Sequence, residues 1–282
     1  MRRAGGGFVL TELLVAMIIA AIIGASLTQL VISQSRFVAL QSATMQARGG
    51  ARAALNVMAT DFRMVSDSGL VAADPDSVTV RVPYAFGVTC MQIAGKTVVS
   101  LLPADSATYF AASISGYAWR DSTGKFVFIK GPGVTASVSF LFLCSWPFTS
   151  PSINTLSTPG WSPRVVALGP NDSRTPPGSV VYLYQEVRYA FAPSGQLPGR
   201  IGLWRTLLST GQRDELVTPF DSTSGFQFLD STLTPAATPP TNLNAVKGLR
   251  LLLVATSELP PEGRTQPMTF NLTTNVVFRN HS

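Results

Sequence analysis

The chain opens with a long apolar stretch. Residues 13–35 contain no charged side chain, and residues 13–32 are apolar except for two hydroxyl residues and one glutamine. At 1.5 Å per helical residue, about 20 residues cross the ~30 Å hydrocarbon core of a bilayer. The stretch therefore predicts a transmembrane helix over about residues 8–32.

Beyond this stretch the helical period continues with a single apolar face. Its apolar positions recur at steps of three and four: Phe37, Leu40, Met45, Ala51, Leu55, Met58 and Phe62. We expect one helix to continue to about Ser66 and to pack this face on a sheet. Gly24 and the pair Gly49-Gly50 lower helix propensity by up to about 1 kcal/mol each, so they mark either a bend or melted turn, or positions of close packing.

From Asp67 onward the period changes to two, which is typical of half-buried strands. Alternating runs occupy residues 78–82, 126–128, 138–142 and 181–183. Segments rich in proline or glycine, predicted to be surface loops, occupy residues 146–164, 169–178 and 234–242. Neither an internal repeat nor a long linker divides this part, so residues 67–282 predict one β-rich domain, and the fold class is α+β.

The last hundred residues predict a regular series of strands. Residues 182–191 and 201–205 flank a turn at Pro193, Ser194 and Gly195, which predicts a β-hairpin. Further strands are expected near residues 216–217, 226–228 and 246–254, with a closing strand that ends at residues 278–280.

Composition narrows the classes of function. Charged residues are 13% of the chain, against about 25% in an average soluble protein, and apolar residues are 46%, which excludes disorder driven by high charge. The one histidine, His281, is penultimate, so a histidine-based triad or zinc site is not expected. Asp74 and Asp76 lack the oxygen density of a calcium loop. We expect no catalytic residue, metal or cofactor.

The charge distribution sets orientation and partners. Arg2 and Arg3 precede the apolar stretch, so the positive-inside rule places the N-terminus in the cytoplasm and the β-rich part outside. The formal net charge is +6, but the basic residues outside the leader never form a run, which does not favour a nucleic-acid partner. Outside the cytoplasm, Cys90 and Cys144 are expected to form a disulfide; two separate buried thiols are the alternative.

The N-terminal motif is the most specific signal. Small residues 4–7 come before the apolar stretch, whereas a secretory signal carries its small-residue cleavage site after it. Gly7-Phe8, followed by Glu12 at the start of an apolar helix, resembles the type III signal of type IV prepilins and type II secretion pseudopilins. A carboxylate at this position is costly near lipid unless it meets a partner.

The resemblance implies how the chain is processed and assembled. A membrane-embedded prepilin peptidase would cut between Gly7 and Phe8, remove the cytoplasmic leader 1–7 and methylate the new amine of Phe8. Glu12 would pair with the N-terminal amine of a neighbouring subunit and set the register of the filament. The alternative is that Glu12 snorkels to the interface of a plain signal anchor. Residues 8–66 would form the helix of a pilin-like "lollipop".

The order of strands over residues 182–280 is similar to that of PilW-type minor pilins and J-type minor pseudopilins. The resemblance implies a structural subunit of a type IV pilus that helps to initiate assembly near the tip, where a large head is tolerated. The alternative is a J-type pseudopilin of type II secretion; a tip adhesin, a DNA-binding pilin and a membrane-anchored hydrolase are further alternatives. Expected partners are the prepilin peptidase, other pilins or pseudopilins bound through the helix, and the inner membrane before assembly. The proline-rich insertion 146–178 exceeds the family pattern.

Overall fold

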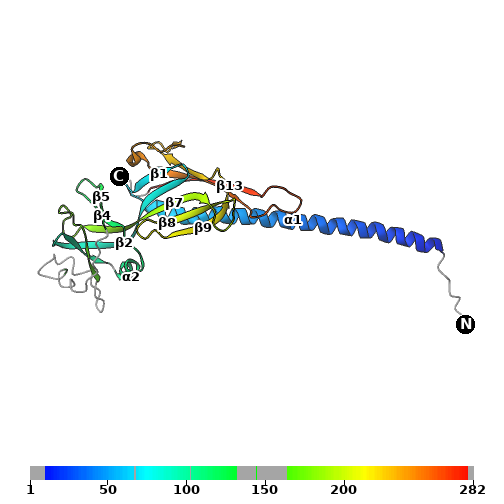
Figure 1. Ribbon diagram of the computed structural model, residues 1–282, viewed down its shortest axis with the longest axis horizontal. Coiled ribbons are helices and arrows are strands. Elements are labelled where there is room, and N and C mark those ends of the chain that lie inside the picture. Colours follow the sequence, from blue (N-terminus) through cyan, green and yellow to red (C-terminus); the bar gives the residue numbers. More distant parts are fainter. Residues whose placement is uncertain (1–9, 67, 102, 132–143, 145–163, 279–282) are drawn as a thin grey trace, which may run out of the picture.

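The structure is a computed structural model that describes residues 10–66, 68–101, 103–131, 144 and 164–278 (Figure 1). One long N-terminal helix, α1 (Leu10–Met64), leads into a head built on a large antiparallel β-sheet. The helix projects far beyond the head, which gives the α+β layout that the hydrophobic pattern predicts. Whether residues 67–282 are one independent domain stays a prediction.

Helix α1 has a projecting part and a docked part. Large apolar side chains are exposed from Leu10 to Ile32, whereas from Ala43 onward one face is buried against the head. Six of the seven buried positions follow steps of three and four: Ala43, Ala47, Ala51, Ala54, Met58 and Phe62; the seventh, Ala59, adjoins Met58. Five of the seven are alanines, and small side chains allow a helix backbone to approach the sheet closely.

The three glycines do not interrupt α1, because the helix is continuous from Leu10 to Met64. The expectation of a melted turn is therefore wrong at these positions. A Cβ at Gly24 or Gly49 would meet no atom of this chain within 4 Å, so close packing at these two positions stays a prediction about neighbouring helices. A Cβ at Gly50 would lie 3.5 Å from Cγ1 of Val217, which is an ordinary van der Waals contact.

The head contains thirteen strands among the described residues, and every pairing between them is antiparallel. They are β1 (Leu70–Asp74), β2 (Ser77–Ile93), β3 (Lys96–Leu101), β4 (Gly116–Arg120), β5 (Phe126–Lys130), β6 (Arg164–Leu168), β7 (Val180–Pro193), β8 (Ile201–Leu207), β9 (Arg213–Phe220), β10 (Gly225–Leu229), β11 (Pro235–Ala236), β12 (Gly248–Thr256) and β13 (Thr269–Val277). The main path runs β11-β10-β12-β9-β8-β7-β2-β3-β6. Strand β13 pairs with β12, β1 with β2, and β4 with β5 and β7.

The apolar core divides along the length of the sheet. The largest cluster joins α1 to the central strands, with Phe62, Tyr189 and Leu251 fully buried. A second cluster, around Tyr117 and Leu183, lies beneath the short helix α2 (Pro103–Ala111) and strands β4 and β5. A 3₁₀ turn, η2 (Leu243–Ala245), precedes β12. The position of α1 in the first cluster means that the head and the docked part of α1 share one core.

The structure confirms most of the predicted strands and adds strands that were not predicted, among them the short strands β6 and β11. The predicted hairpin is β7 and β8, paired from Val187 with Leu207 to Pro193 with Ile201. Residues 164–168, which join the predicted loops 146–164 and 169–178, form β6, which pairs with β3. The run 138–142, and residues 146–163 of the insertion, lie outside the described residues. Short strand β11 falls inside the predicted loop 234–242.

Candidate functional site

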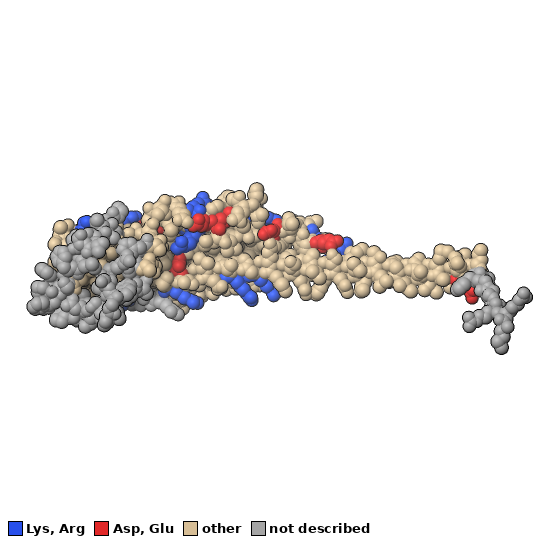
Figure 2. Space-filling view, turned by 90° about the horizontal axis from the view of Figure 1, so that it is seen from below, with Lys and Arg blue, Asp and Glu red and all other residues tan. Residues whose placement is uncertain are grey.

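The projecting part of α1 is a surface suited to lipid or to other apolar helices. An 18-residue window within α1 has a mean hydropathy of 2.3, and none of it is buried within the molecule. From Leu10 to Ile32 the helix is about 34 Å long, which matches the ~30 Å hydrocarbon core. On the face shown in Figure 2, charged side chains are lacking from this part except near its N-terminal end. The helix is therefore long and apolar enough to span a membrane.

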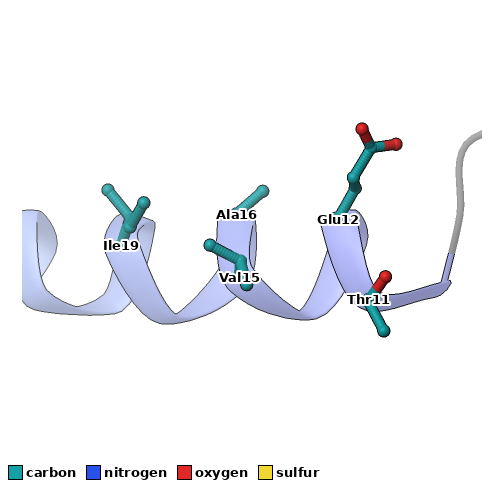
Figure 3. Close-up of a pocket in the computed structure, with 5 residues that line it drawn as sticks. All are labelled: Thr11, Glu12, Val15, Ala16 and Ile19. Carbon is teal, nitrogen blue, oxygen red and sulfur yellow. The ribbon is translucent and has the colours of Figure 1, made fainter.

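Glu12 lies in the first turn of α1. Figure 3 shows its carboxylate pointing away from the helix axis, on the same side as Ala16 and Ile19, while Thr11 points to the other side. These side chains line one shallow depression on the helix surface. A negative charge in the first turn is favoured by the helix dipole. Gly7 and Phe8, the predicted cleavage and methylation residues, lie outside the described residues.

A polar contact fixes the docked part of α1 to the sheet. The hydroxyl of Tyr189 on β7 donates to Oδ2 of Asp61 at 2.5 Å, and Nε of Arg205 on β8 donates to the same hydroxyl at 3.2 Å. The Arg205 guanidinium lies 3.7 Å from Oδ2 of Asp61. Burial, with the nearby Asp61 charge, raises the pKa of Tyr189 far above its ordinary value, so the phenol stays protonated and remains a donor.

Phe62 adds an aromatic contact at the same place. Its ring meets that of Tyr189 edge to face at 5.3 Å and that of Phe226 at 6.2 Å, and it is fully buried. One turn of α1 thus combines a buried ring and a hydrogen-bonded carboxylate against three strands. This arrangement fixes the last turns of α1 to the sheet.

Cys90 and Cys144 are joined by a disulfide in the structure, with their Cα atoms 5.2 Å apart and a sequence separation of 54. The bridge packs with Val98 and Val165 in a small buried cluster. It ties Cys144 to the far end of β2, at the opposite end of the head from α1's projecting part.

Two ion-pair clusters lie in the distal half of the head. The buried carboxylate of Glu186 accepts from Nζ of Lys130 at 3.0 Å and from Nε of Arg81 at 3.4 Å, beside a hollow of about 270 Å³. Asp172 accepts from Nε and Nη2 of Arg174 at 2.9 and 2.8 Å, and these bonds lower the pKa of Asp172. Over the described part of the chain, no cluster of three or more His, Cys, Asp or Glu side chains is placed to hold a metal ion.

Sequence reasoning identified Glu12 and the two cysteines but missed Asp61 with Tyr189 and Arg205. One signal was present: Asp61 is the sole acidic residue of α1 after Glu12, and it falls beside the apolar face. The comparison with protein-family models, the comparison with curated proteins and the comparison with solved structures each found no match for this chain.

Proposed function

We propose that this chain is a PilW-type minor pilin, a structural subunit that helps to start assembly of a type IV pilus and lies at or near its tip. The observation that carries the proposal is the combination at the N-terminus: Gly7-Phe8 in the sequence, then Glu12 in the first turn of an exposed apolar helix. A plain membrane anchor requires the apolar helix alone and gives no reason for a carboxylate at that turn.

The geometry supports an assembly mechanism in three parts. The exposed apolar surface of α1 holds the subunit in the inner membrane and then packs against other helices in the filament. Glu12 projects from the helix, where the methylated amine of a neighbouring Phe8 pairs with it and sets the axial register. The contact of Asp61 with Tyr189 and Arg205 carries that register to the head. The head is large for a densely packed shaft, which favours a position at the tip.

A J-type minor pseudopilin of type II secretion is the second candidate, because the same N-terminal signal and strand order serve both systems. Partners separate the two. A pilin should be recovered from sheared surface filaments together with other minor pilins, whereas a pseudopilin should co-purify with a pseudopilus complex and its loss should block exoprotein release. An adhesin would have the same location as the pilin. In that case, deletion of residues 146–163 should abolish attachment of the cells to surfaces but leave piliation intact.

The Glu12→Val variant tests the assembly mechanism, with Thr11→Val as its matched control on the other side of the same turn. Breaking a buried charge pair from one side typically costs about 3 to 5 kcal/mol, enough to exclude the subunit from filaments. We expect Glu12→Val to be cut by the peptidase normally but to be absent from sheared filaments, and Thr11→Val to enter them. A bulky residue at Gly7 should instead block cleavage. Equal incorporation of the Glu12→Val and wild-type proteins would refute the mechanism.

A further inference from the structure

The loop between β12 and β13, residues 257–268, reaches further toward the projecting part of α1 than the rest of the head (Figure 1). Its base is closed by the buried residue Ser257, whose amide donates to the carbonyl of Met268 at 2.8 Å and whose hydroxyl accepts from the Met268 amide at 3.0 Å. The amide of Arg264 donates to the carbonyl of Pro261 at 2.9 Å, which forms a turn at the tip. The loop is therefore an ordered projection.

Two contacts fix the loop along α1. The amide of Glu258 donates to Oε1 of Gln46 at 3.3 Å, and the hydroxyl of Ser35 donates to Oε2 of Glu262 at 3.4 Å. Gln46 and Ser35 are eleven residues apart, so the loop descends about 16 Å along the helix. Its tip, Glu262 to Arg264, lies beside Ser35 and Arg36.

The level of the tip can be compared with the bilayer. The closely spaced run of exposed large apolar residues that is long enough to span ends at Ile32, and Phe37 and Val38 are exposed about one turn beyond it. Ser35 and Arg36 therefore lie about 5 to 6 Å beyond the end of the apolar span, beside these two apolar side chains. A bilayer is about 40–45 Å thick including its headgroups, against ~30 Å for the hydrocarbon core, which leaves a polar layer of about 5 to 8 Å on each side. When the helix spans a membrane, the tip of the loop therefore lies at the depth of the headgroups.

The side chains at the tip suit that layer. Arg36 and Arg264 are both exposed, and within the described part of the chain neither forms an ion pair within 4 Å. The Arg36 guanidinium lies beside Gly263, with its Nε 3.7 Å from where a Cβ on that glycine would be. Guanidinium groups bind phosphate through paired hydrogen bonds. Glu258 and Glu262 balance the two arginines, which matches a zwitterionic headgroup better than a strongly anionic surface.

We infer that the loop 257–268 is a membrane contact that rests in the phospholipid headgroup layer, where Arg36 and Arg264 bind headgroup phosphates. This inference rests on the membrane anchoring that the proposed function includes. The contact limits how deeply and at what tilt the subunit lies in the membrane before assembly, and it must be released when the subunit is extracted into a filament.

Nitroxide depth measurement on the full-length protein in phosphatidylcholine/phosphatidylethanolamine nanodiscs tests the inference. Single labels are placed by Thr265→Cys in the loop, Ile22→Cys in the projecting helix and Ser209→Cys in the distal turn after β8, all at exposed positions; the wild-type protein is the control for labelling of Cys90 and Cys144. We expect the ratio of oxygen to nickel-chelate accessibility at residue 265 to lie between those at residues 22 and 209. Arg36→Gln with Arg264→Gln should move it toward the value at residue 209, with the value at residue 22 unchanged.

The outcomes separate the loop from the anchor. A label at residue 265 as exposed to water as that at residue 209, with residue 22 in lipid, overturns the loop contact and leaves the anchor intact. A water-exposed label at residue 22 overturns the anchor itself, and the loop contact with it. Two further results would overturn the assignment of zwitterionic phosphates as the ligand. In the first, the two glutamine substitutions leave the depth of residue 265 unchanged. In the second, residue 265 enters the headgroup layer only when phosphatidylglycerol is added.

Discussion

The projecting and docked parts of α1 share one secondary structure but differ in which side chains they expose and which they bury. Residues 10–32 expose leucine, isoleucine, valine and methionine on every side, whereas the docked part buries a narrow row that consists largely of alanine. Large side chains on all faces create a surface for an apolar solvent or for neighbouring helices, while small ones bring the helix backbone close to a sheet. Residue size, rather than hydrophobicity alone, therefore distinguishes a helix that serves as an anchor from one that belongs to a core.

The largest effect should come from emptying the shared core. Phe62→Ala removes a fully buried ring and should lower the free energy of unfolding of the head by about 3 to 5 kcal/mol. Ile22→Ala, in the projecting part, is the matched control and should change it by less than about 0.5 kcal/mol. Urea denaturation of the full-length protein in detergent, followed by tryptophan fluorescence, measures both. Similar losses of unfolding free energy in the two variants would contradict the difference between the docked and projecting parts of α1.

Overpacking should show the reciprocal difference. Ala51→Leu forces a larger side chain into a position with no exposed surface and should destabilise the head by about 1 to 3 kcal/mol. Ala20→Leu adds the same atoms to an exposed position in the projecting part and should be neutral within about 0.5 kcal/mol. The same denaturation experiment applies. A neutral Ala51→Leu variant would contradict the close approach of α1 to the sheet.

The polar contact at the end of α1 should have a smaller effect. Tyr189→Phe keeps the ring against Phe62 but removes the donor to Asp61, so we expect a loss of about 1 to 3 kcal/mol. Hydrogen exchange of the backbone amides around Asp61 should accelerate, while exchange in the distal strands β4 and β5 should not. Uniform acceleration across the head would show that the contact does not act locally between helix and sheet.

The smallest effect is expected at the ion pair of Asp172 with Arg174, which does not involve α1 and so serves as a reference for the other variants. Hydrogen bonds from Arg174 lower the pKa of Asp172 in the folded state. The contribution of this contact to stability is therefore complete above the ordinary pKa of an aspartate carboxyl, about 3.9. It is lost as the pH falls through the lowered pKa of the folded state. Arg174→Gln should lower the free energy of unfolding only slightly at pH 7, since the Arg174 side chain is largely exposed, and the difference from wild type should shrink in acid. A difference that grows in acid would contradict this sign.

The sequence predicted the elements whose patterns are long and unmixed. The absence of charge over residues 13–35 and the steps of three and four that follow predicted α1 nearly to its end, and alternation predicted parts of β2, β5 and β7. Strand β6 was missed because five residues between proline-rich flanks read equally well as loop, and only pairing with β3 settles their conformation.

The contacts of the candidate site were predictable only in part. Glu12 stands out because it is a lone carboxylate before an apolar run. Asp61 meets Tyr189 and Arg205 across separations of 128 and 144 residues, and one sequence gives no means of pairing positions so far apart. The loop 257–268 likewise has no local signal of its depth, which follows only from where β12 and β13 end along α1.

Mass spectrometry of the N-terminus of the protein purified from its native membrane tests the central proposal most directly. Processing as a pilin predicts a chain that begins at Phe8, carries one methyl group on its amine and lacks residues 1–7. The Glu12→Val variant should give the same N-terminus, since cleavage depends on the Gly7-Phe8 junction. A chain that retains Met1 and the leader, or one cut after the apolar stretch so that Glu12 is lost, would contradict the proposal.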